Sequence, residues 1–220
     1  MGRSRAFEGL IPVAAALVAF AFWQSPLLLP LKIFVVLLHE ISHGLAAVLT
    51  GGAIVSIHLS ADEGGLCLTR GGSRFLTLSA GYLGSLFFGA LLVLVAARSR
   101  RDRAVVALLG IALLGVTLIF VRTLFGVAYG LLAGAALLLA ARTLPESASD
   151  AILKVLGAVS CLYAVWDIAS DVLLRDVPGS DASALGRLTG VPAPVWGLLW
   201  AGIAVVVTAF TFLKAARAGR

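Results

Sequence analysis

The sequence predicts an all-α polytopic membrane protein, a bundle of six or seven transmembrane helices with a short membrane-associated β-hairpin. Of its 220 residues 60% are apolar and 13% are charged, whereas soluble domains carry about 25% charged residues. The mean hydropathy is +1.06. The apolar residues form runs of roughly the 20 residues that one helical crossing needs. These runs leave no length for a separate soluble domain, so we expect residues 1–220 to form one integral-membrane domain.

The predicted spans are apolar runs bounded by charge, proline or glycine. In lipid such a segment must be helical, because only a helix satisfies its own backbone groups there. The first run follows Arg3 and Arg5 but has no convincing cleavage site, so we expect a retained helix rather than a removed signal peptide. The spans are residues 10–30, 31–50, 75–97, 104–121, 124–141, 152–174 and 194–213.

Residues 51–74 are too polar to span. Isolated apolar residues alternate with polar ones and are flanked by glycine pairs, which predicts a short β-hairpin that turns near residues 62–65.

The net charge of +6 does not indicate a nucleic-acid partner, because the basic residues lie at the edges of apolar runs. That distribution is typical of cytoplasmic loops, and the cluster at 98–103 is its strongest case. Cys67 and Cys161 are isolated and predict neither a disulfide framework nor a thiolate metal site.

Two ladders of small residues predict close helix contacts. The favoured use is packing within the bundle, and the alternative is a homodimer seam through the first ladder. The ladders are Gly126, Gly130 and Gly134, and Gly81, Ser85 and Gly89.

The candidate chemistry lies in the second span, where residues 39–43 read His-Glu-Ile-Ser-His. His39 and His43 are four residues apart, so their imidazoles project from one helix face and can bind one Zn²⁺. Glu40 can take a proton from a water on that metal, which is the general-base role in an HExxH arrangement. Ionisable groups within a span are costly and usually functional.

A catalytic zinc site normally has three protein ligands, so a third must come from elsewhere. Asp167 and Asp171 are the acidic residues inside a later apolar run, and their spacing puts them on one helix face. We prefer Asp167, with Asp171 as the alternative ligand or as a partner that orients a histidine. Counting from Lys32 and Lys154, Asp167 lies about 9 Å further along its helix than His39 does.

Two further positions carry weaker signals. His58 falls in the hairpin and is expected to be a surface histidine rather than a ligand. Ser180 is expected to cap a short amphipathic helix, and a functional role for Asp181 is left open.

These features together resemble the site-2 protease-type intramembrane zinc metalloproteases, in the compact bacterial branch without a PDZ domain. The resemblance implies that His39, His43 and Asp167 bind zinc and that Glu40 is the general base. One departure is that the family's later aspartate lies in a Leu-Asp-Gly context, whereas Asp167 lies between Trp166 and Ile168. The likeness rests on His-Glu-Ile-Ser-His in an early span, the glycine-rich hairpin after it, Ser-Ala-Gly-Tyr-Leu-Gly-Ser at 79–85, and an aspartate in a later span.

By this resemblance the protein hydrolyses peptide bonds of membrane-embedded protein or peptide substrates, in regulated intramembrane proteolysis. Its place would be the bacterial inner membrane, and the hairpin would guide an extended substrate strand by edge pairing. Two alternatives stay open: an inactive relative that binds membrane partners, and a metal transporter that uses His and Asp as a transit site.

Overall fold

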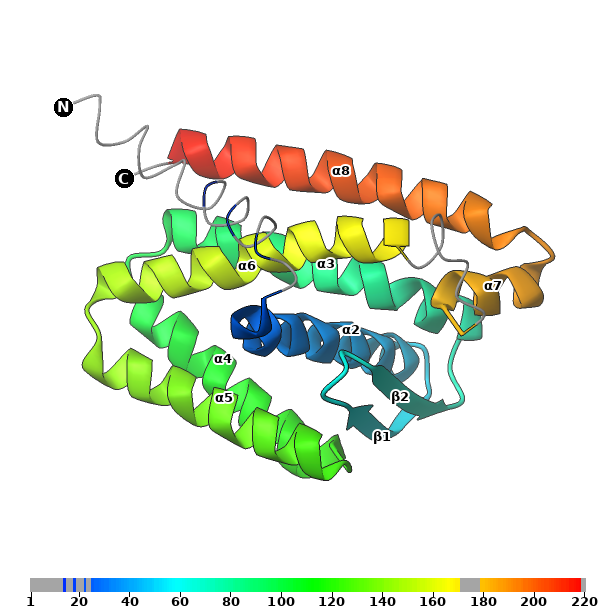
Figure 1. Cartoon of the computed structure of the whole chain (residues 1–220), viewed down its shortest axis with the longest axis horizontal. Helices are drawn as coiled ribbons and strands as arrows, with labels where there is room; N and C mark the ends of the chain where they lie inside the picture. The colour runs from blue at the N-terminus through cyan, green and yellow to red at the C-terminus, as the bar shows by residue number, and fades with distance from the viewer. Residues whose placement is uncertain (1–13, 15–17, 19–21, 23–24, 171–178, 219–220) are drawn as a thin grey trace.

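The computed structural model describes residues 14, 18, 22, 25–170 and 179–218. In this part the chain is a bundle of long helices with one small sheet (Figure 1). The helices are η1 (Pro26–Leu28), α2 (Leu29–Leu49), α3 (Arg74–Arg98), α4 (Asp102–Phe120), α5 (Leu124–Thr143), α6 (Glu146–Ile168), α7 (Asp181–Thr189) and α8 (Ala193–Ala218), and the strands are β1 (Ala53–Leu59) and β2 (Gly65–Arg70).

Six of the described helices, with η1 counted as the start of α2, are long and apolar enough to cross a membrane: α2, α3, α4, α5, α6 and α8. This confirms an integral, multi-pass membrane protein. The spans predicted from residue 31 onward are each found as a helix. The run at 10–30 lies mostly outside the described residues, as does the end of the run at 152–174.

Helix α2 is the central element of the bundle. It is the most buried of the six candidate spans, whereas α4 and α5 are the most exposed. Helices α3 and α6 pack extensively against each other, α4 packs with α5, and α8 covers α3 and α6 (Figure 1). The site residues on α2 are therefore held inside protein rather than against lipid.

The first glycine ladder packs within the chain. A Cβ added to Gly130 would lie 2.1 Å from Oγ1 of Thr117, and one added to Gly134 would lie 2.7 Å from Cγ of Leu114. Both neighbours belong to α4. The glycines thus let α4 and α5 approach closely, which is the intramolecular use that the sequence favoured.

The predicted hairpin is present and folds back along α2. Its two strands are antiparallel, with Leu59 opposite Gly65 across the turn. The start of β1 lies at Gly44 of α2, where an added Cβ would meet Ile54. The start of β2 lies at Val36, nearer the beginning of α2, where a Cβ on Gly65 would meet the Val36 side chain. The hairpin therefore lies beside a spanning helix and not beyond its end.

The outer edge of β1 is occupied by the corner between α4 and α5. The backbone N–H of Arg122 donates to the Ile57 carbonyl at 3.0 Å, and the hydroxyl of Thr123 donates to the Leu59 carbonyl at 2.8 Å. Among the described residues no strand pairs with the other edge of β2. That edge borders the site.

Candidate active site

His39, Glu40 and His43 lie on the buried part of α2, as the sequence predicts. The two imidazole rings are neighbours, with centroids 4.7 Å apart. Glu40 is 5% exposed and His43 is 7% exposed. The helical spacing has thus produced two adjacent imidazoles with a carboxylate beside them.

The third group at the imidazoles is Asp181, the first residue of α7. Its Oδ2 lies 3.0 Å from Nε2 of His39 and 3.2 Å from Nε2 of His43, and the three ligand atoms are all within 4.8 Å of one another. Tetrahedral zinc with ligands about 2.0–2.1 Å away has its ligand atoms about 3.3 Å apart. The three atoms therefore fit one metal ion.

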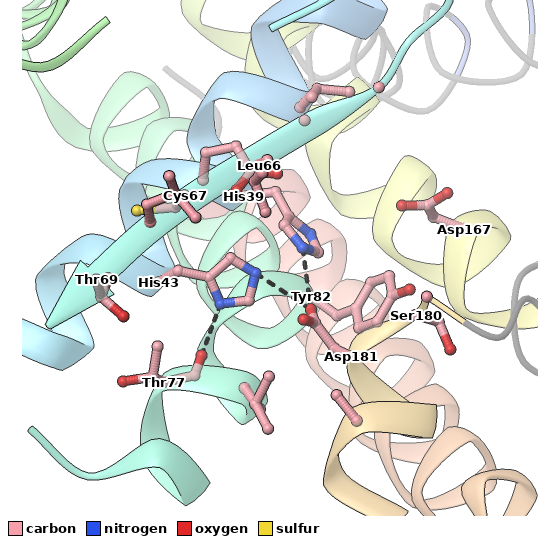
Figure 2. Close-up of a pocket in the computed structure, with 18 of the residues that line it drawn as sticks. His39, His43, Leu66, Cys67, Thr69, Thr77, Tyr82, Asp167, Ser180 and Asp181 are labelled. Carbon is pink, nitrogen blue, oxygen red and sulfur yellow. Dashed lines mark hydrogen bonds and ion pairs between the residues drawn. The ribbon is translucent and has the colours of Figure 1, made fainter. Parts of the chain in front are cut away.

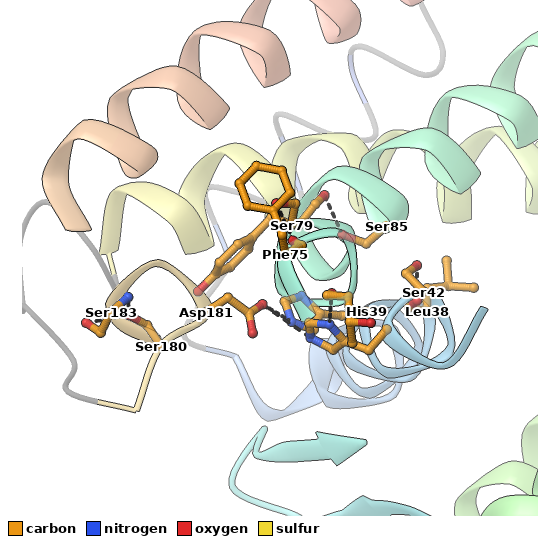
Figure 3. Close-up of polar contacts among 12 residues, drawn as sticks. Leu38, His39, Ser42, Phe75, Ser79, Ser85, Ser180, Asp181 and Ser183 are labelled. Atoms are coloured by element: carbon orange, nitrogen blue, oxygen red, sulfur yellow. Dashed lines mark hydrogen bonds and ion pairs between the residues drawn. The ribbon is translucent and has the colours of Figure 1, made fainter. Parts of the chain in front are cut away.

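Local structure explains why Asp181 points inward. Ser180 accepts a hydrogen bond from the backbone N–H of Ser183 at 3.3 Å and so caps α7, as expected from the sequence. The cap fixes the first turn of α7, from which the carboxylate of Asp181 reaches the imidazole of His39 (Figure 3).

Oδ2 of Asp181 is buried and accepts no hydrogen bond of ordinary geometry among the described residues. A buried carboxylate oxygen without such a partner is costly. A cation bound between this oxygen and the two imidazole nitrogens would remove that cost. The donor set, two nitrogens and one carboxylate oxygen, is one that zinc accepts.

The tautomer of His43 is set by the backbone of α3. Nδ1 of His43 lies 2.7 Å from the carbonyl oxygen of Thr77, and a carbonyl can only accept, so Nδ1 must carry the proton. In the neutral ring this leaves the lone pair on Nε2, which faces Asp181 (Figure 2). Outer hydrogen bonds of this type orient metal-binding histidines.

Gly81 of α3 forms one wall of the site. A Cβ at this position would lie 2.3 Å from Nε2 of His39 and 2.6 Å from Oδ2 of Asp181. Any side chain would occupy the space next to the ligand atoms. The second ladder, which contains Gly81, thus serves the site as well as helix packing.

The carboxylate of Glu40 lies against β2. A Cβ on Gly65 would be 2.3 Å from Oε1 of Glu40, and the carboxylate accepts a hydrogen bond from the backbone of Cys67. Burial, and then the charge of Glu40, raise the pKa of the Cys67 thiol to about 12. Cys67 therefore remains a neutral thiol beside the site.

These residues border a cavity of about 790 Å³ between α2, β2, α3, α7 and the end of α6. On the α3 side Tyr82 lies edge-on to the His39 ring, with centroids 4.9 Å apart. On the hairpin side the wall is Leu66, Cys67, Leu68 and Thr69 of β2. The cavity thus has a polar centre and a strand along one side.

The structure separates the two aspartates proposed from the sequence. Asp167 lines the same cavity from α6, across from the imidazoles (Figure 2), and Asp171 lies outside the described residues. The carboxylate that contacts both histidines is instead that of Asp181. The sequence placed Asp167 about 9 Å further along its helix than His39. In the structure α7 brings a different aspartate, Asp181, to the level of His39.

Sequence reasoning left the role of Asp181 open and did not include it among the ligands, because only acids inside apolar runs were considered as ligands. The available signal was the Ser180 cap with an acid at the first position of an amphipathic helix after a late span. His58 is paired with Ser56, whose Oγ is 2.9 Å from its Nε2, and is not in the group that could hold a metal.

Comparison with known proteins shows the family of the chain. A model of the Peptidase M50B-like family matches residues 12–211. The chain belongs to this family. This family is the site-2 protease family of membrane metallopeptidases. The match confirms the resemblance drawn from the motifs. No curated protein and no solved structure matches the chain.

Proposed function

We propose that this protein is an intramembrane zinc metalloprotease that hydrolyses peptide bonds of membrane-embedded substrates. The observation that carries the proposal is the meeting of His39, His43 and Asp181 within 4.8 Å, beside the buried carboxylate of Glu40. The family resemblance suggests the bacterial inner membrane, with the arginine cluster at 98–103 on the cytoplasmic side.

His39 and His43 would hold the metal through Nε2 and Asp181 through Oδ2, which leaves the cavity side for water and substrate. Bound zinc would polarise the scissile carbonyl and lower the pKa of a water molecule. Thr77 keeps the Nε2 lone pair of His43 turned toward the ligand position through its hydrogen bond to Nδ1. Asp167, which lines the same cavity from α6, is proposed to act outside the ligand set.

Glu40 is the proposed general base. Its carboxylate would take a proton from the attacking water and deliver it to the nitrogen of the leaving amine, so that one group serves both steps. Its place under β2, fixed by Gly65 and Cys67, puts this group on the side from which a strand-like substrate would approach.

The substrate is proposed to bind as an extended strand along the outer edge of β2. The opposite edge of the hairpin is already occupied at Ile57, and the β2 side lines the cavity. Edge pairing supplies backbone hydrogen bonds without demanding a particular sequence. A helical substrate must unwind first, because a helix uses its own backbone groups in internal hydrogen bonds.

The test combines metal analysis and cleavage. We expect purified protein to hold about one zinc per chain, His39→Ala to lose it, and Glu40→Gln to keep it while cleavage falls by at least about 100-fold. If the protein is an inactive relative that binds membrane partners, even the wild type would show no cleavage. A transporter would keep its metal flux in Glu40→Gln. Absence of stoichiometric zinc in both wild type and His39→Ala would end the enzyme proposal.

A further inference from the structure

The turn of the hairpin is tied to the beginning of α2 by a partly buried ion pair. Nζ of Lys32 lies 2.8 Å from Oε1 of Glu63, and the two side chains are 8% and 32% exposed. Lys32 precedes His39 by seven residues, about 10 Å along the helix. This contact of a buried lysine with a half-buried glutamate joins segments that are distant in sequence and holds the turn at one level of α2.

The residues that hold Glu40 follow this ion pair directly in the chain. Gly65 is two residues after Glu63 and packs on the Glu40 carboxylate. Cys67 is two residues further on, and its backbone N–H donates a hydrogen bond to the same carboxylate. A strand rises about 3.3 Å per residue, so a displaced turn would carry these contacts with it. The position of Glu40 is therefore coupled to that of Glu63.

The rest of the hairpin is anchored independently. β1 is joined to the α4–α5 corner at Ile57. The connection that follows β2 is packed on α2, where a Cβ on Gly72 would lie 2.7 Å from the Ala47 carbonyl. Loss of the ion pair would leave these attachments in place. Gly65 and Cys67 also pair with Leu59 and Ile57 of β1, so loss of the ion pair would loosen the turn and this end of the ladder, next to Glu40, without detaching β2.

We propose that Lys32 and Glu63 are positioning residues that act on Glu40 through β2: their ion pair holds the turn against α2 and so keeps Gly65 and Cys67 on the Glu40 carboxylate. The effect of this ion pair on cleavage rests on the proposed function. Its structural role, holding β2 in place, is independent of that function.

The structural part is tested by the reactivity of Cys67. In the full-length chain with Cys161→Ala, Cys67 is the remaining cysteine, because the sequence has two. We expect Glu63→Gln to raise the rate of Cys67 alkylation by a maleimide about tenfold through local opening. Asp62→Asn is the matched control, since it removes a neighbouring charge whose partner is Ser60, and should leave the rate within about twofold.

Charge exchange separates the ion pair from a general effect of mutation. Lys32→Glu should alkylate faster, and the Lys32→Glu/Glu63→Lys double variant should return to within about threefold of the parent rate. Zinc content should be unchanged in Glu63→Gln, while kcat falls more than KM changes. Equal alkylation rates in Glu63→Gln and Asp62→Asn would overturn the proposal. So would a folded double variant that reacts as fast as Lys32→Glu. Because alkylation needs neither zinc nor cleavage, this result stands even if the protein proves not to be a protease.

Discussion

Oδ2 of Asp181 and Nε2 of His39 lie 3.0 Å apart, although one belongs to a short helix near the end of the chain and the other to the central helix α2. Both atoms lie against the backbone of α3, where a Cβ on Gly81 would be within 2.6 Å of either. Three helices therefore have to be packed correctly before the site exists. This dependence makes the account testable by small substitutions.

Gly81→Ala should weaken metal binding strongly without unfolding the bundle. The added methyl would lie 2.3 Å from Nε2 of His39, so the imidazole must move away from Asp181. We expect zinc affinity to fall at least about 100-fold, beyond the loss typical of outer-sphere changes. Competition with a zinc chelator measures the affinity.

The control for this substitution is Gly115→Ala in α4, where an added Cβ has no neighbour within 4 Å. It should bind zinc as wild type does. Wild-type affinity in Gly81→Ala would mean that the ligand atoms are not those assigned.

Gly65→Ala should separate metal binding from catalysis. Its methyl would lie 2.3 Å from Oε1 of Glu40 and 2.8 Å from Cγ1 of Val36, which displaces the base or lifts β2. Zinc content should remain at the wild-type level while kcat falls by about 10²-fold or more. Gly179→Ala serves for comparison, because Gly179 also lines the cavity but has no neighbour within 4 Å of an added Cβ. Equal loss of kcat in both variants would contradict the role given to Gly65.

Gly130→Val should destabilise the fold without changing the oligomeric state. The side chain would collide with Thr117 of α4, and overpacking of this kind costs about 1–3 kcal/mol. Thermal unfolding in detergent measures the loss, and Leu132→Ala, at a position 72% exposed, is the comparison. A change from dimer to monomer in Gly130→Val with unchanged stability would favour the homodimer seam instead.

Much of this architecture was predictable because lipid imposes strong constraints on sequence. The spans from residue 31 onward could be located from hydropathy, and the polar, glycine-flanked stretch at 51–74 could only form a hairpin between them. The pair His39 and His43 followed from helical spacing alone. Each of these inferences uses only residues that are close together in the sequence.

The contacts that complete the site could not be predicted in the same way. Asp181 reaches His39 through the packing of α7 against α3, and Lys32 meets Glu63 because the hairpin folds back along α2. Neither relationship has a periodicity that a sequence scan can detect. Asp167 satisfied the sequence criteria, being an acid inside an apolar run, yet α6 carries it to the opposite side of the cavity.

The identity of the carboxylate ligand is the most direct test of the account. Zinc should be counted in purified, full-length Asp181→Ala and Asp167→Ala proteins beside the wild type. We predict about one zinc per chain in the wild type and in Asp167→Ala, with two imidazole nitrogens near 2.0 Å by X-ray absorption, and loss of zinc in Asp181→Ala. Zinc retained in Asp181→Ala and lost in Asp167→Ala would contradict the site described above.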